Sequence, residues 1–197
     1  DVNLAALLSD FVAGKATNVA RVLTTLGERA VVTGFLGGER AAIMRRSLDA
    51  EGIAHDFLDV TAPTRLCVTV IDRQQQTATE LVEESSPVSP ADAERLLDRL
   101  DRMLDGATML VLSGSLAPGV PADFYRRCVE KASTRNIRTL VDGSGEPLRL
   151  ALAAKPYLVK PNRRELAITL GRAIESDGEL ASAMREMTQL GAYEIIV

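Results

Sequence analysis

The feature that most constrains this chain is a repeated order of apolar run, small or polar turn, and amphipathic segment. The stretches 108–115, 137–145 and 157–162 each combine an apolar run with such a turn, and each precedes residues that suit a helix start. Strands that alternate with helices form parallel sheets covered by helices on both faces. The sequence therefore predicts an α/β fold with a doubly wound, mostly parallel sheet.

Apolar spacing places the other elements. It predicts strands at 28–38 and 194–197, and helices at 17–27, 39–52, 89–104, 121–133, 162–170 and 177–190. Ser89 suits an N-cap, with Pro90 as the first helical residue. The apolar face of 89–104 consists of Ala93, Leu96, Leu97, Leu100 and Leu104. The apolar face of 17–27 consists of Val19, Val22, Leu23 and Leu26.

Residues 56–84 depart from this rhythm, because their apolar residues alternate instead of recurring at helical spacing. Leu66, Val68 and Val70 fall on one face of the predicted strand, and the residues between them fall on the other. We expect a small antiparallel excursion that serves as a lid or an interface. The chain then divides into an α/β core, residues 1–55 with 85–197, and a β lid, residues 56–84.

Composition argues against several classes of partner. With 46% hydrophobic and 25% charged residues, the 197-residue chain can bury one substantial core. Its formal net charge of −4 gives no reason to expect a nucleic acid or an anionic membrane as partner, and no apolar run is long enough for a transmembrane helix. The first ten residues lack the basic region of a signal peptide. Cys67 and Cys128 are expected to be buried free thiols, so we expect a cytoplasmic protein.

Small and polar residues follow four of the expected strands. They are 34–38, Ser113-Gly114-Ser115, 142–145 and 160–162. Each precedes an expected helix start, where free backbone N–H groups and a partial positive charge favour anions. Because ligands bind beyond the carboxyl ends of parallel strands, we expect a phosphate-binding edge there.

Common nucleotide and metal motifs are not satisfied. Around Lys15, Walker A would need glycine at Ser9 and serine or threonine at Ala16, so Lys15 alone could be a solvated surface residue. The glycines of 34–38 lack the G-x-G-x-x-G spacing and predict a tight turn from strand to helix. His55 is the only histidine, and with two scattered cysteines it does not make a zinc site.

Two strand ends carry charges that local structure explains only in part. An ionised Asp142 at the end of a buried strand needs a partner, which is either the following turn or a ligand. Asn162 suits an N-cap, with Glu165 as its capping-box partner. Neither role explains Lys160, since a helix start disfavours a cation, whereas a nearby anion would explain it.

Six stretches together resemble the PfkB-type carbohydrate kinases of the ribokinase-like superfamily, in the family's order from residue 13 to the end. They are AGKATNVARVLTTLG, TGFLGG, PTRLCVTVID with TELVEE, LSGSLAPGVPADFY, VDGSGEPL and LVKPNRREL. The branch that they resemble most is the phosphosugar kinases, which comprise 1-phosphofructokinase, tagatose-6-phosphate kinase and the minor 6-phosphofructokinase. The resemblance implies ATP and Mg²⁺ as cofactors and a homodimer through the lid.

The resemblance also implies a role for each matching position. Arg65 would bind the phosphate that the substrate already carries, a bidentate task that suits a guanidinium. Lys160 would reach the nucleotide phosphates, and Asn162 and Glu165 would organise Mg²⁺, mainly through water. The positions that would hold the sugar, line the cleft or lie near the phosphates are Gly14, Lys15, Asn18, Ser113, Gly114, Ser115 and Asp142.

The chain departs from the family pattern at several points. Ala13 replaces the first glycine of Gly-Gly-Lys, and Gly143 replaces the usual threonine or asparagine. The family's opening strand has no counterpart in DVNLAALLSDF. The Gly-Ala-Gly-Asp signature, which carries the anion hole and the catalytic base in the family, is not found before Val197. We therefore expect a fragment whose C-terminal part, with the catalytic aspartate, is absent.

The resemblance thus implies that the parent protein is a phosphotransferase. It would pass the γ-phosphoryl group of ATP to a hydroxyl of fructose 1-phosphate, fructose 6-phosphate or tagatose 6-phosphate, mainly by positioning and charge stabilisation. A non-catalytic sugar- or nucleotide-binding protein of the same fold is the alternative. A third possibility, a nucleoside or ribose kinase, would have no need of Arg65.

Overall fold

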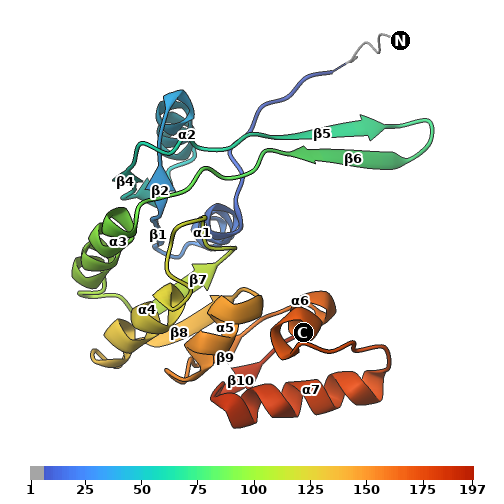
Figure 1. Cartoon of the computed structure of the whole chain (residues 1–197). Helices are drawn as coiled ribbons and strands as arrows, with labels where there is room; N and C mark the ends of the chain where they lie inside the picture. The colour runs from blue at the N-terminus through green and yellow to red at the C-terminus, as the bar shows by residue number, and fades with distance from the viewer. Residues whose placement is uncertain (1–6) are drawn as a thin grey trace.

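The computed structural model describes residues 7–197 and shows helices arranged around parallel strands (Figure 1). The helices are α1 (Lys15–Thr25), α2 (Glu39–Ala50), α3 (Pro90–Met103), α4 (Phe124–Ser133), α5 (Gly145–Leu152), α6 (Arg163–Leu170) and α7 (Asp177–Leu190). The strands are β1 (Val31–Val32), β2 (Phe35–Leu36), β3 (Ala54–His55), β4 (Leu58–Asp59), β5 (Cys67–Asp72), β6 (Thr77–Val82), β7 (Met109–Ser113), β8 (Arg138–Asp142), β9 (Leu158–Val159) and β10 (Glu194–Ile195). Residues 1–6, part of the stretch tested for a signal peptide, lie outside the described residues.

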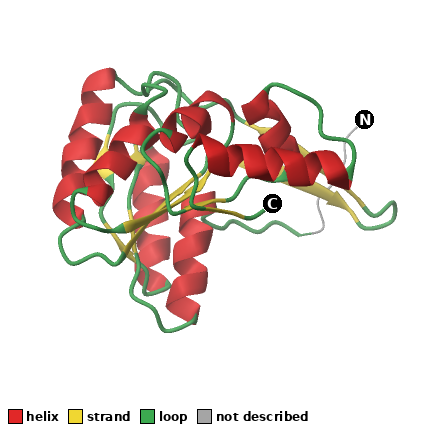
Figure 2. Ribbon diagram, turned by 90° about the horizontal axis from the view of Figure 1, so that it is seen from below, coloured by secondary structure: helices red, strands yellow, loops and turns green. Residues whose placement is uncertain are grey.

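The main sheet has the order β10-β9-β8-β7, and all its neighbouring strands run parallel. Helices lie on both sides of the strands when the molecule is seen from below (Figure 2). This arrangement confirms the predicted α/β fold. The register places Ser113, the last residue of β7, opposite Asp142, the last residue of β8, so the polar ends of these two strands meet at one edge.

A second parallel pairing joins residues 31–36 to residues 54–59. β1 pairs with β3 and β2 pairs with β4, with Gly34 between the two short ladders. His55 belongs to β3, and its Nε2 lies 3.1 Å from Asp49 Oδ1. The chain then leaves this pairing after β4 and forms the lid.

The lid is an antiparallel ribbon of β5 and β6 that extends away from the body of the molecule (Figure 1). The expected antiparallel pair is confirmed, but the pattern placed its start too early, because residues 58–59 still pair in parallel with β2. Nearly all side chains of the ribbon are exposed on both faces. The expectation of a buried thiol is therefore wrong for Cys67, which the ribbon exposes, and confirmed for Cys128 in α4.

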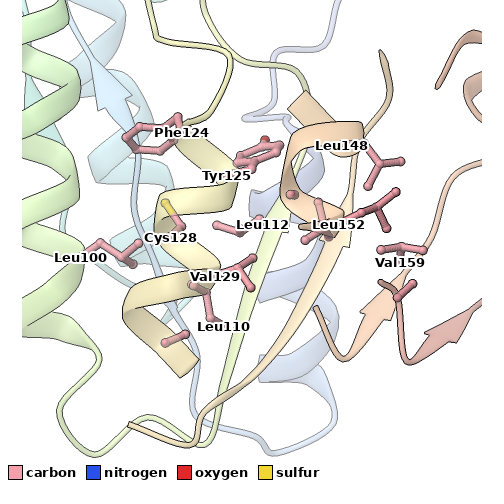
Figure 3. Close-up of a cluster of buried hydrophobic side chains, with 14 of the residues drawn as sticks. Leu100, Leu110, Leu112, Phe124, Tyr125, Cys128, Val129, Leu148, Leu152 and Val159 are labelled. Atoms are coloured by element: carbon pink, nitrogen blue, oxygen red, sulfur yellow. The ribbon is translucent and has the colours of Figure 1, made fainter. Parts of the chain in front are cut away.

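The largest core lies between the main sheet and helices α3, α4 and α5 (Figure 3). The whole predicted apolar face of α3 is buried in it. Ser89 caps α3 as expected, since its Oγ accepts from the N–H of Asp92 at 3.0 Å. No helix within residues 7–197 is long and apolar enough to cross a membrane.

Helix α1 forms where the sequence predicted it, but its predicted apolar face is only partly confirmed, since Val19 and Leu23 are half-buried. The buried residues of α1 are Thr17 and Ala20, whereas Val22 and Leu26 are 58% and 71% exposed. The helix contacts both β1 and β7. Its small side chains permit this close approach, so the contact face follows side-chain size and not apolar content alone.

Candidate functional site

The candidate site begins at the adjacent ends of β7 and β8. Ser113 Oγ donates a hydrogen bond to Asp142 Oδ2 at 2.8 Å, and the N–H of Gly114 donates to the Asp142 carbonyl oxygen at 2.9 Å. Asp142 is only 9% exposed. A buried carboxylate requires partners of this kind, so the two strand ends form one hydrogen-bonded unit.

Two lysines supply the positive charge that the Asp142 carboxylate needs. Lys15 Nζ lies 3.4 Å and Lys160 Nζ lies 3.7 Å from Asp142 Oδ1. Among the described residues, no group of the following turn donates a hydrogen bond to the Asp142 side chain. Asp142 therefore does not cap that turn, and its carboxylate is available to other side chains and to a ligand. The Lys160 side chain, which capping could not explain, therefore faces an anion of the protein itself.

Lys15 also reaches α6, because its Nζ donates a hydrogen bond to Glu165 Oε1 at 3.0 Å. Partial burial alone would lower the pKa of Lys15. The hydrogen bond to Glu165 and the charge of Asp142 outweigh that effect and raise the pKa above its usual value. Lys15 is therefore held in its charged form between two carboxylates, and is not the isolated surface lysine that the sequence left open.

The predicted capping box of α6 is confirmed. Asn162 Oδ1 accepts from the N–H of Glu165, and Glu165 Oε2 accepts from the N–H of Asn162, each at 2.9 Å. Asn162 Oδ1 and Glu165 Oε2 are thus occupied, while Glu165 Oε1 faces Lys15.

This donor set fits Mg²⁺ only with added oxygen ligands. Within residues 7–197, no three His, Cys, Asp or Glu side chains gather closely enough to hold a metal ion by themselves. Mg²⁺ keeps several waters and takes one or two carboxylates plus substrate phosphates. Glu165 and the neighbouring Asp142 carboxylate suit that partial role, and Asn162 could contribute through water while it caps α6.

A cleft of about 320 Å³ opens beside this charge cluster. Six of the predicted substrate residues line it, and they come from three separate parts of the chain: Gly14, Lys15, Arg65, Ser113, Gly114 and Ser115. Gly14 has φ of +136°, a backbone conformation that favours glycine, and this turn directs Lys15 into the cleft from the start of α1. The structure thereby brings together residues that are about 100 positions apart.

Arg65 stands at the base of the lid and lines the cleft with an exposed side chain. Within the described residues, its guanidinium makes no ion pair or hydrogen bond. Gly37 fixes the neighbouring backbone, since the N–H of Thr64 donates to the Gly37 carbonyl at 2.9 Å and the N–H of Gly37 donates to Thr64 Oγ1 at 3.1 Å. A Cβ at Gly37 would lie 2.1 Å from the Ala62 carbonyl oxygen, so only glycine permits this approach.

Asn18 is the one predicted sugar residue that the structure places apart from the cleft's lining. It lies on the exposed side of α1, and its Oδ1 accepts from Arg21 Nη1 at 2.8 Å. Its role in sugar binding stays a prediction.

The sequence interpretation missed Tyr125. This buried residue of α4 donates its hydroxyl to the Gly114 carbonyl at 3.0 Å, and its ring packs beneath Gly143, where an added Cβ would lie 3.4 Å from Cε2. Burial raises the pKa of Tyr125 far above its usual range, so the phenol stays a donor. Tyr125 thus contacts the residue that directly follows β7 and the residue that directly follows β8. A buried tyrosine needs a partner for its hydroxyl, and this requirement was the available signal.

Comparison with known proteins decides the family. A family model described as pfkB family carbohydrate kinase matches residues 2–197. The chain belongs to the pfkB family of carbohydrate kinases. The resemblance inferred from the six sequence stretches is confirmed.

Solved structures place this pfkB-family chain beside phosphofructokinases. Phosphofructokinase-2 from Escherichia coli, in its tetrameric inhibited form, matches with a TM-score of 0.85 and 28% identity over 93% of this chain and 61% of its own. The same enzyme in complex with fructose-6-phosphate gives a TM-score of 0.84 with the same identity and coverage. A possible 1-phosphofructokinase from Thermotoga maritima, at 24% identity, matches all of this chain and 65% of its own with a TM-score of 0.85, which supports the fold. The chain thus spans less than two thirds of the length of these neighbours.

Proposed function

We propose that this chain supplies the sugar-phosphate and nucleotide cleft of an ATP- and Mg²⁺-dependent kinase acting on a phosphosugar. The observation that carries the proposal is a cleft lined by both Lys15 and the exposed Arg65, in which Lys15 is paired with Asp142 at 3.4 Å. A guanidinium that lines a cleft and has no hydrogen-bond or ion-pair partner among residues 7–197 suits a phosphate. Family membership supplies the reaction class, and E. coli phosphofructokinase-2 was solved with fructose-6-phosphate.

The chain's own residues would act by binding and orientation. Arg65 would hold the substrate's existing phosphate, while the turn of Gly14 and the strand end Ser113-Gly114-Ser115 would line the sugar. Lys160 would approach the nucleotide phosphates, with Glu165 and Asn162 beside the Mg²⁺ ion. When bound, Mg²⁺ would neutralise charge on those phosphates. The proton acceptor for the sugar hydroxyl is expected outside these residues.

Two further features belong to the proposal. The exposed apolar side chains of the β5–β6 ribbon support a homodimer through the lid, because an isolated two-stranded ribbon is marginal in water. The two free cysteines support a reducing, cytoplasmic location.

The phosphate role is tested by calorimetric titration of fructose 6-phosphate and fructose into the wild type and Arg65→Ala. Loss of a charge-assisted bidentate contact weakens binding by about tenfold or more, so Arg65→Ala should lose affinity for fructose 6-phosphate and not for fructose. Arg73→Ala, the same change at an exposed position of the lid turn, serves as the matched control. Equal affinity of the wild type and Arg65→Ala for fructose 6-phosphate would contradict the phosphosugar assignment and favour a ribose or nucleoside kinase.

A further inference from the structure

Lys15 occupies a position that local structure disfavours. It is the first residue of α1, where the helix dipole repels cations. The first turn of α1 contains no acidic residue, and Gly14 supplies no side-chain cap. The charge of Lys15 must therefore be stabilised by groups from elsewhere in the fold.

Those groups are two carboxylates from distant parts of the chain. Asp142 ends β8 and Glu165 lies in the first turn of α6, and one oxygen of each lies within 3.4 Å of Lys15 Nζ. The other oxygen of each carboxylate is fixed: Asp142 Oδ2 accepts from Ser113 Oγ, and Glu165 Oε2 accepts from the N–H of Asn162. Both acids are thus anchored at one oxygen and direct the other toward the same cation.

This geometry is that of a cation site in which the protein supplies its own cation. Two converging, anchored carboxylate oxygens would repel each other without a positive charge between them. Lys160 lies near Asp142 only, at 3.7 Å, and makes no contact with Glu165 among the described residues. The ammonium of Lys15 is therefore the charge that joins the two acids.

We propose that Lys15 is an internal counter-cation that competes with a divalent metal ion for Glu165 and Asp142. The identity of that ion as Mg²⁺ rests on the proposed function, but the competition itself does not. Binding of the metal displaces the ammonium from Glu165 Oε1. The displaced ammonium stays in the cleft, because Gly14 and Lys15 line it. Metal binding and the position of Lys15 are thus coupled, and the metal binds more weakly than the two carboxylates alone would allow.

The proposal is tested by titrating Mn²⁺, a hard divalent probe with an electron paramagnetic signal, into the wild-type chain and into Lys15→Met. Removing a positive charge about 3 to 4 Å from the ligand oxygens should tighten Mn²⁺ binding by roughly fivefold or more. Lys131→Met is the matched control, since it removes the same charge from an ion pair with Asp101 on α4 and α3. It should leave Mn²⁺ affinity unchanged.

A double-mutant cycle assigns the effect to Glu165. Glu165→Gln removes the charge and keeps an acceptor for the capping box, so α6 should still form. In that background, Lys15→Met should gain much less affinity for Mn²⁺. Thermal unfolding followed by circular dichroism checks that each variant folds, and binding of Mn²⁺ to Lys15→Met itself requires a formed site.

The outcomes separate this inference from the proposed function. Unchanged or weaker Mn²⁺ binding in Lys15→Met, a gain that persists in full with Glu165→Gln, or absence of Mn²⁺ binding in both wild type and Lys15→Met would each overturn it. None of these readouts uses kinase activity. A protein that fails to phosphorylate sugars could still show the competition, and an active kinase could still lack it.

Discussion

At the level of single residues, Asp142 organises the candidate site. Its carboxylate lies within 4 Å of Lys15 and Lys160, and it accepts from Ser113. These contacts explain why Lys15 stands at the start of α1 and Lys160 stands just before the start of α6, where the helix dipole disfavours a cation. The sequence indicated that Asp142 and Lys160 needed partners, but it could not show that they partner each other, because strand register and sheet order decide that contact.

Tyr125 carries the first prediction. Tyr125→Phe removes the donor to the part-buried Gly114 carbonyl and should lower the free energy of unfolding by about 1 kcal/mol, the net contribution of a typical intramolecular hydrogen bond. It should also loosen the Ser113-Gly114-Ser115 turn and weaken fructose 6-phosphate binding. Urea unfolding and calorimetry measure the two effects.

Tyr157→Phe is the control for that experiment, since its hydroxyl contacts Glu194 at an exposed position. It should change stability by much less. If both variants unfold at the same urea concentration as the wild type, Tyr125 does not support the cleft.

At the level of elements, the capping box of α6 was predictable because its signals are local in sequence. Asn162 and Glu165 are three residues apart, and their reciprocal hydrogen bonds depend only on the helix start. The buried face of α1 was not predictable in the same way. It depends on which small residues allow α1 to approach β1 and β7, and that is a property of packing between distant elements.

The second prediction separates the capping role of Asn162 from any ligand role. Asn162→Ala should destabilise the chain by about 1 kcal/mol, whereas Asn162→Asp keeps the side-chain acceptor and should retain most of that stability. Thermal unfolding measures both. A loss of stability in Asn162→Asp as large as in Asn162→Ala would show that the cap is not what stabilises α6.

The third prediction concerns the ion pairs that join α3 to α4. Arg127 of α4 binds Glu94, and Asp101 binds both Lys131 of α4 and Arg135, which lies just after α4. The hydrogen bond from Arg127 lowers the pKa of Glu94. Burial would raise the pKa of Asp101, but Arg135 and Lys131 lower it overall. Charged residues of both helices line the nearby groove of about 390 Å³, and this pairing favours a structural role for them over a ligand site.

The folded-state pKa values of Glu94 and Asp101 lie below their usual values of 4.5 and 3.8. The stabilisation of the folded state by these two carboxylates is therefore fully present at pH values above the usual pKa values. It is lost as pH falls through the folded-state values. The melting temperature should therefore fall on acidification below the usual values, and Arg127→Gln should reduce that dependence. An identical acid dependence in wild type and Arg127→Gln would show that this pair contributes nothing.

At the level of the whole molecule, the body and the lid differ in what stabilises them. The body has two buried clusters, whereas the lid ribbon exposes apolar side chains on both faces. The sequence predicted both the fold class and an antiparallel lid, because periodicity distinguishes helices from alternating strands. It could not predict how far Cys67 and its neighbours stand from the core, since nothing local in the sequence fixes what covers them.

The fourth prediction tests the proposed lid dimer. Val68 and Leu81 are paired across the ribbon, so they share one face with each other and not with Thr69. Val68→Glu should shift the protein from dimer to monomer in sedimentation velocity, because it places a charge in an apolar interface. Thr69→Glu, on the opposite face, is the matched control. A wild type that sediments as a monomer would contradict the lid dimer.

The measurement that tests the central proposal most directly is phosphoryl transfer by the full-length protein that carries this chain. ATP, Mg²⁺ and either fructose 6-phosphate, fructose 1-phosphate, tagatose 6-phosphate or unphosphorylated fructose would be followed by ³¹P NMR. We predict a new sugar phosphate signal with at least one phosphorylated sugar, its loss when EDTA removes the metal, and much slower transfer to fructose. No transfer to any sugar phosphate, or equal transfer to fructose, would contradict the assignment of this cleft to a phosphosugar kinase.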